Sequence, residues 1–291
     1  MVTIGSAGVL APGKWRWLRA LGWMVALTVT IVLAYNGAAQ ATLLALATDP
    51  ASPGAKFTAG IAGSIALVVA YWAAVRFGER RHVPELNLRR APLDLLFGLT
   101  VGAAMMVAIV GILWAFGWVV IEARTVDRVA LALRDSIRSG VLEELVMRLV
   151  VLRLLWRAFG IWPAMIAAAL TFGMLHLANP DSSWWAAACL IAGEGVGIGL
   201  YLITGRIWAP IGMHAAWNFT QGWIFGAVVS GTTDIAGGPL SLRPVPGSPD
   251  LLSGGGFGPE ASLAALVVSL VGSVLFLVRA WRLGRMTAAD G

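Results

Sequence analysis

The chain has 291 residues, of which 58% are hydrophobic and only 12% are charged, and its mean hydropathy is +0.80. A soluble domain carries about 25% charged residues, so this composition excludes a large soluble core and favours a polytopic membrane protein. The net charge is +6, but the basic residues are spread over short loops, which argues against a nucleic-acid partner.

Eight stretches approach or exceed the roughly 20 apolar residues that cross a bilayer. They are residues 18–47, 57–77, 93–121, 129–158, 161–178, 183–204, 207–230 and 260–280. The predicted fold is therefore all-α, a bundle of about eight transmembrane helices that forms one membrane domain over 1–291. The small residues at 37–41 resemble a signal-peptide cleavage site, but the apolar pattern continues to residue 48, so we expect an uncleaved first span.

Basic residues set the expected orientation, because Lys and Arg concentrate on the cytoplasmic side of membrane proteins. With eight spans, the basic clusters at 14–19, 76–90, 153–157 and 279–285, together with Arg206, all fall on one side. Both termini are therefore predicted to be cytoplasmic, and the chain is predicted to lie in the cell's inner (plasma) membrane. The linker 231–259 falls on the other side, and its Gly, Pro and Ser predict an irregular cap.

The fourth span contains the stretch VLEELVMR at 141–148, in which Glu143, Glu144 and Arg148 interrupt an apolar run. Glu144 and Arg148 are four residues apart, so they share a helix face and can pair. Glu143 points about 100° away, and we interpret it as a less neutralised carboxylate suited to general acid–base work. The alternative is that both glutamates only balance arginines along an amphipathic helix, although ionisable residues inside membranes usually mark function.

Other polar residues recur in later spans. The fourth and fifth spans form a predicted hairpin that turns near Phe159–Gly160, and Glu143 and His176 both lie about 24 Å from that turn. His214 and Asn218 share one face of the seventh span, yet they lie only about 13 and 19 Å from Gly205, which is a mismatch in depth. We expect Glu194, which glycines flank, to be a polar residue at a helix contact.

The remaining His and Cys residues are given no chemical role. His82 lies in a loop. The single cysteine, Cys189, excludes an intramolecular disulfide and a Cys-rich metal site, and it is predicted to be a small core residue.

Three motifs resemble those of the CPBP family, the CAAX-protease and bacteriocin-processing intramembrane proteases (type II CAAX prenyl endopeptidase-like). EELVMR fits Glu-Glu-x-x-x-Arg, FGMLH fits Phe-x-x-x-His and HAAWN fits His-x-x-x-Asn. The resemblance covers roughly 129–222 and implies an eight-helix intramembrane endopeptidase with this segment as catalytic core. Carried over residue by residue, it assigns Glu143, Glu144, Arg148, Phe172, His176, His214 and Asn218 to the site.

Peptide hydrolysis needs an activated water and a stabiliser for the oxyanion. The preferred scheme lets Glu143, helped by His176, deprotonate a water while His214 and Asn218 donate to the oxyanion and Arg148 holds Glu144. The rival scheme uses zinc, with Glu143 or Glu144, His176 and His214 as ligands. No His-Glu-x-x-His helix is present, so the metal stays unassigned.

Two other functions are left open by the sequence. Buried Glu and His residues also occur in proton-coupled transporters, although no inverted repeat is visible. A non-catalytic membrane scaffold or immunity factor could keep the same residues. For the hydrolase, the expected partners are the lipid bilayer and a membrane-embedded or lipidated peptide or protein substrate.

Overall fold

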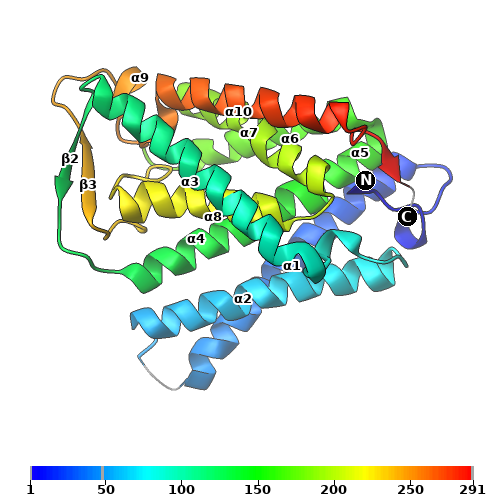
Figure 1. The fold of residues 1–291 in the computed structure, drawn as a ribbon. Coiled ribbons are helices and arrows are strands. Elements are labelled where there is room, and N and C mark those ends of the chain that lie inside the picture. The colour runs from blue at the N-terminus through cyan, green and yellow to red at the C-terminus, as the bar shows by residue number, and fades with distance from the viewer. Residues whose placement is uncertain (1, 47–48, 290–291) are drawn as a thin grey trace.

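The computed structural model describes residues 2–46 and 49–289 and confirms the all-α fold (Figure 1). Residue 47, the predicted end of the first span, and residues 290–291 of the predicted domain lie outside the described residues. The helices that build the bundle run alternately in opposite directions, except that α5 continues α4 in the same direction. They are α1 (Arg16–Leu46), α2 (Pro53–Ala73), α3 (Ala91–Ala115), α4 (Val129–Glu144), α5 (Arg153–Phe159), α6 (Ile161–Leu175), α7 (Trp184–Thr204), α8 (Trp208–Asn218) and α10 (Leu263–Arg282).

Helices α4 and α5 form one rod, because the π-helical stretch Leu145–Leu152 joins them. π-Helical turns also extend α2 through Ala74–Gly78 and α8 through Phe219–Ile224. Within the described residues, six helical segments are long and apolar enough to cross a membrane; the α4–α5 rod and α8 are not among them. A total of eight spans therefore stays a prediction.

Local sequence explains where several helices begin and end. Ser183 caps α7 by accepting a hydrogen bond from the amide of Ala186, and Ser262 caps α10 in the same way, as small hydroxyl residues do at N-termini. Gly160 has a φ of 92° and separates α5 from α6, which confirms the predicted hairpin turn. Glycine suits this place because an L side chain is strained at positive φ.

Two predicted boundaries are wrong. Helix α3 ends at Ala115 rather than at residue 121, because Gly117 turns the chain (φ 72°) into strand β2 (Val119–Ala123). The π-helical end of α8 stops at Ile224 rather than at residue 230. It stops there because Gly226 (φ 61°) reverses the chain, close to the carbonyl oxygen of Leu240.

The linker 231–259 is less irregular than predicted. It contains strand β3 (Leu240–Pro244) and the short helix α9 (Asp250–Ser253). Strand β3 pairs with β2 in antiparallel register, Val119 opposite Pro244, and buries Val119 and Leu242 against the end of α3. This apolar face, which alternates with exposed residues along the strands, is what orders the segment.

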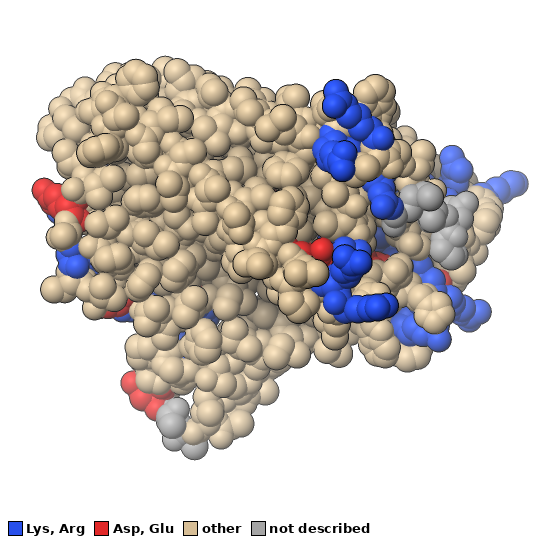
Figure 2. All heavy atoms as spheres, in the orientation of Figure 1, with Lys and Arg blue, Asp and Glu red and all other residues tan. Residues whose placement is uncertain are grey.

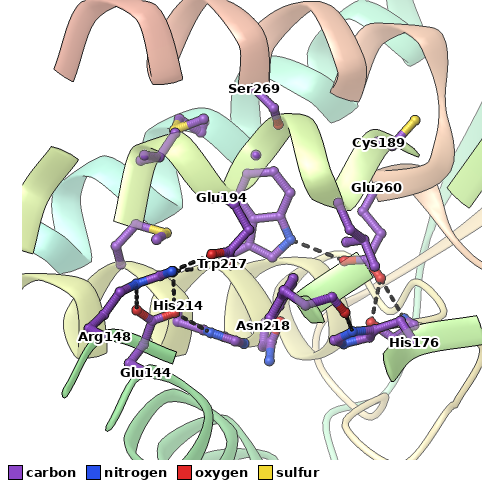
Figure 3. A pocket seen from close by; sticks show the side chains of 17 residues that line it. Glu144, Arg148, His176, Cys189, Glu194, His214, Trp217, Asn218, Glu260 and Ser269 are labelled. Atoms are coloured by element: carbon purple, nitrogen blue, oxygen red, sulfur yellow. Dashed lines mark hydrogen bonds and ion pairs between the residues drawn. The ribbon is translucent and has the colours of Figure 1, made fainter. Parts of the chain in front are cut away.

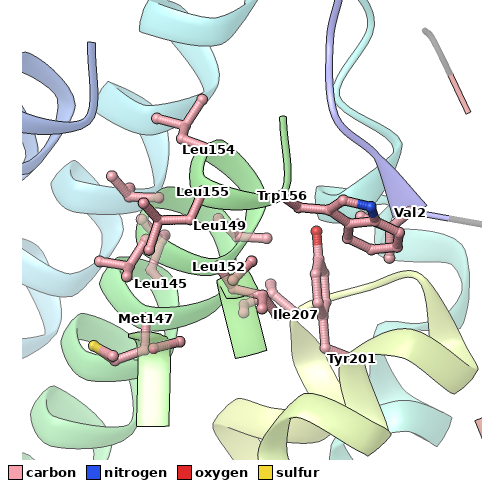
Figure 4. Close-up of a cluster of buried hydrophobic side chains, with 14 of the residues drawn as sticks. Val2, Leu145, Met147, Leu149, Leu152, Leu154, Leu155, Trp156, Tyr201 and Ile207 are labelled. Atoms are coloured by element: carbon pink, nitrogen blue, oxygen red, sulfur yellow. The ribbon is translucent and has the colours of Figure 1, made fainter. Parts of the chain in front are cut away.

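Both ends of the described chain lie at one end of the bundle. Strand β1 (Val2–Thr3) pairs with β4 (Ala288–Ala289) in parallel, and Figure 1 shows the termini together. A buried apolar cluster fills this end. Figure 4 shows its side chains from the π-helical stretch and α5, among them Leu145, Leu149 and Leu152, beside Tyr201.

Ion pairs hold the loops at this same end. The guanidinium of Arg153, which has no exposed area, bonds the carboxylate of Glu79 at 2.7 Å and 2.8 Å, and Arg81 bridges Glu79 to Glu85. Burial opposes ionisation of Glu79, but Arg153 and Arg81 outweigh it and hold the pKa of this carboxyl below its ordinary value.

Candidate active site

The two motif glutamates lie in different environments, as their angular separation predicts. The side chain of Glu143 is 34% exposed, whereas that of Glu144 is 1% exposed. Successive helical residues diverge by about 100°, so Glu144 is buried while Glu143 keeps part of its surface exposed.

A continuous chain of charges surrounds Glu144. The Nε atom of Arg148 donates to its carboxylate at 2.8 Å, and the same guanidinium also binds the carboxylate of Glu194 on α7. Arg148 is 1% exposed, so the two acids compensate a fully buried cation. The pairing of Arg148 with Glu144 agrees with the sequence prediction. The pairing with Glu194 was missed, because spacing along one helix does not show which neighbouring helix supplies a second partner.

Glycines make this arrangement possible. A Cβ atom built on Gly197 would meet the guanidinium of Arg148, and one built on Gly140 would meet the carbonyl oxygen of Ile211 at 3.0 Å. The first glycine leaves room for the buried cation beside α7. The second lets α4 approach α8 closely.

The close packing of α4 and α8 brings His214 into the site. Its Nδ1 atom lies 2.9 Å from Oε1 of Glu144, and its Nε2 atom lies 3.7 Å from Oε2 of Glu143. The depth mismatch that was counted from Gly205 therefore does not separate these residues.

His176 approaches Glu143 from the other side. It ends α6 and begins the short turn His176–Ala178, and its Nε2 atom lies 3.9 Å from Oε2 of Glu143. Its Nδ1 atom lies 2.8 Å from the carbonyl oxygen of Phe172, whose ring packs against the imidazole with centroids 4.5 Å apart. The predicted juxtaposition of Glu143 and His176 across the hairpin is confirmed as geometry.

Asn218 lies one turn after His214 and is 8% exposed. Its amide nitrogen donates to the hydroxyl of Ser139 at 2.8 Å. Sequence analysis missed Ser139, although its position four residues before Glu143, on the same helix face, is a signal that could have found it.

Two cavities meet at these residues. The larger is about 520 Å³ and is lined by Glu143, and the smaller is about 80 Å³ and is lined by Glu144, Arg148 and Glu194. His176, His214 and Asn218 line both cavities. Figure 3 shows the smaller cavity, with the Glu144–Arg148–Glu194 chain on one side and His176 on the other.

A further buried acid, Glu260, borders the smaller cavity and was also missed by sequence analysis. It is 4% exposed and accepts hydrogen bonds from the amide and hydroxyl of Ser230, both at 2.7 Å, and from the indole of Trp217. Ser230 has a φ of 47°, so Glu260 holds a strained loop residue against the site. Glu260 comes just before α10, outside the recognised motifs, and only the fold brings it here.

The remaining candidates lie apart from this chemistry or do not form a metal site. His82 is exposed in the loop after α2, as expected, and Cys189 is a buried free thiol. Across residues 2–46 and 49–289, no three His, Cys, Asp or Glu side chains are arranged to hold a metal ion. Glu143, His176 and His214 nevertheless come together, with the two Nε2 atoms 3.9 Å and 3.7 Å from Oε2 of Glu143, so the zinc alternative stays beside the metal-free scheme.

One comparison with known proteins matches the segment that holds these residues. Residues 125–220 match the family model described as Rce1-like, type II CAAX prenyl endopeptidase Rce1-like, which confirms the predicted CPBP resemblance. The matched segment runs from before α4 into the end of α8 and holds all the motif residues. At family level it indicates an intramembrane protease of the CAAX-processing type. No curated protein and no solved structure matches the chain.

Proposed function

We propose that the protein is an intramembrane endopeptidase that hydrolyses a peptide bond of a membrane-associated or lipidated substrate with a water activated by Glu143. The observation that carries this proposal is the placement of one partly exposed carboxylate between the Nε2 atoms of two histidines, at the edge of a large cavity. The match of this segment to a protease family supports it.

The two histidines present their Nε2 atoms to the water site. In His176, Nδ1–H donates to the carbonyl oxygen of Phe172, so Nε2 of the neutral ring is an acceptor. The separations of 3.9 Å and 3.7 Å from Glu143 are too long for direct hydrogen bonds, which leaves room for a shared water. Glu143 takes the proton as the water attacks the carbonyl carbon, and it returns that proton to the leaving amine.

His214 and Asn218 are the proposed donors to the oxyanion. Glu144 accepts from Nδ1–H of His214, so a proton on Nε2 makes the ring a cation that this carboxylate stabilises. Asn218 donates one amide hydrogen to Ser139. Its second amide hydrogen is available to the oxyanion, and an amide donates whatever the pH. Such preorganised donors act where negative charge develops in the transition state.

The charge chain behind these residues is proposed to position them. Arg148 fixes both oxygens of Glu144, and Glu144 in turn fixes the ring of His214. Arg148 and Glu144 touch no reacting atom in this scheme, so they are positioning residues.

The test is hydrolysis of a peptide library by the purified protein in detergent, read by mass spectrometry. Glu143→Gln should abolish cleavage, because the amide cannot accept the proton. Two matched controls are Glu122→Gln, an exposed glutamate on β2, and His82→Gln in the loop after α2. Cleavage by Glu143→Gln at the parent rate would refute the proposal. Uptake into proteoliposomes that depends on Glu143 would favour the transporter instead.

A further inference from the structure

The two ends of the bundle differ strongly in charge. The segments 14–19, 76–90 and 279–285, together with Arg153, Arg157 and Arg206, bring Lys and Arg to the end that holds both described termini. Figure 2 shows Lys and Arg side chains gathered on that side of the molecule. This is the Arg-rich end of the bundle.

Arginines at the opposite end are balanced by local acids. Arg124 lies 3.5 Å from Asp127, Arg243 lies 3.1 Å from Glu122, and Arg134 and Arg138 both pair with Asp135. This end, the balanced end, therefore carries little net charge. The two ends still differ in charge when acidic residues are counted.

The larger cavity extends from Glu143 toward the balanced end, and Thr28 and Val32 of α1 form one side of it. From Glu143 its wall follows α4 toward the N-terminus, through Ser139 and Arg138 to Asp135, and continues in the loop after α8 at Thr232 and Asp234. None of the basic segments of the Arg-rich end lines it.

Toward the Arg-rich end the wall of the larger cavity reaches Val146 and Met147, and closely packed side chains follow. Leu145, Leu149 and Leu152 have no exposed area, and they follow Glu143 along the same rod (Figure 4). Beyond them lies Arg153, locked to Glu79. Interiors packed in this way hold no channel wide enough for a peptide.

From these observations we propose that the hydrolytic site opens to the non-cytoplasmic side of the membrane. Positive charge marks the cytoplasmic side, so the Arg-rich end faces the cytoplasm and the cavity faces away from it. This inference rests on the proposed function for its substrate class, which is a polypeptide segment presented from the non-cytoplasmic face, such as the membrane-proximal part of an exported protein. A tail that stays in the cytoplasm cannot reach Glu143.

The first experiment locates the mouth with a membrane-impermeant maleimide. Asp234 is exposed and lines the larger cavity, so Asp234→Cys places a thiol at the mouth of that cavity. Arg89 is exposed at the Arg-rich end, and Arg89→Cys places a thiol there. The parent chain is the blank, because its single cysteine is buried. Asp234→Cys should react in intact spheroplasts, and Arg89→Cys only in inverted membrane vesicles. The reverse pattern, reaction of both on one side, or no reaction of Asp234→Cys on either side would overturn the proposal.

The second experiment tests whether the mouth is the substrate's entrance. A bulky maleimide on Asp234→Cys in detergent should remove most of the hydrolysis of a cleaved library peptide, and the same label on Arg89→Cys should leave the rate unchanged. Equal rates for both labelled variants would show that substrate enters elsewhere. Side-specific labelling needs no activity, so a failure of the proposed function and a failure of this inference give different results.

Discussion

Gly197→Ala should destabilise the protein by displacing Arg148. The new methyl group would overlap the guanidinium, with the Cζ atom only 2.9 Å away. A long side chain usually moves aside at little cost, but this one is fully buried and bound to Glu144 and Glu194. It can move only by giving up part of those bonds. Overpacking costs about 1–3 kcal/mol, and breaking a buried ion pair costs about 3–5 kcal/mol, so we expect a loss of at least about 2 kcal/mol.

A matched control lies one turn earlier on the same helix. An added Cβ on Gly193 meets Ser269 at 3.6 Å, an ordinary contact, so Gly193→Ala should change stability by less than about 1 kcal/mol, with the helix preference for alanine in its favour. Thermal unfolding of both variants in the same detergent gives the comparison. Equal unfolding temperatures for the two would refute the reasoning that Arg148 is held immobile by its two acids.

Three further outcomes follow from the site and its surroundings. Asn218→Ala should fold and lose at least about a hundredfold in kcat, because one oxyanion donor contributes roughly 3–4 kcal/mol. Ser139→Ala removes only the partner that orients the amide, so its kcat should fall less. A near-normal kcat for Asn218→Ala would remove Asn218 from the scheme. The lowered pKa of Glu79 means that its ion pairs contribute stability at neutral pH, and that this contribution is lost as the pH falls through the folded-state pKa, below the ordinary carboxyl value of about 4. Glu79→Gln should therefore unfold at a lower temperature than the parent at pH 7, with the difference shrinking in acid; a constant difference would contradict the linkage. The metal-free scheme predicts that chelation leaves hydrolysis unchanged, because Glu143 and the two histidines activate the water themselves. Loss of activity that zinc restores would overturn that scheme.

Sequence patterns predicted the fold where a single helix carries the information. Apolar length located the helical segments, and a positive-φ glycine at 160 marked the hairpin correctly. The patterns failed where the chain leaves the helices. The first three residues of β2, 119–121, were assigned to the end of a span because they are apolar enough to continue one. Only the pairing of β2 with β3 across a long sequence separation reveals a strand.

For the site, too, the sequence predicted relations within one helix but not contacts between helices. Spacing of four residues identified the Glu144–Arg148 pair and the shared face of His214 and Asn218, because both relations lie within one helix. Spacing could not give the depth of α8, because α8 packs closely against other helices through glycines on α3, on α4 and on α8 itself. It also could not assign Glu194 or Glu260, because their partners come from other elements.

The roles of the two adjacent glutamates follow from this division. Arg148 and His214 both bind Glu144, so its charge is already paired within the protein, and only 1% of its surface is exposed. Glu143 has no hydrogen-bonded cation among the described residues, and it faces the larger cavity. Replacing each glutamate in turn by glutamine therefore distinguishes a catalytic role from a stabilising one. Glu143→Gln should stop catalysis with stability unchanged, whereas Glu144→Gln should lower stability as well, because it leaves Arg148 with one fewer compensating charge. If both variants unfolded at the parent temperature, Glu144 would not be the residue that makes the buried arginine tolerable.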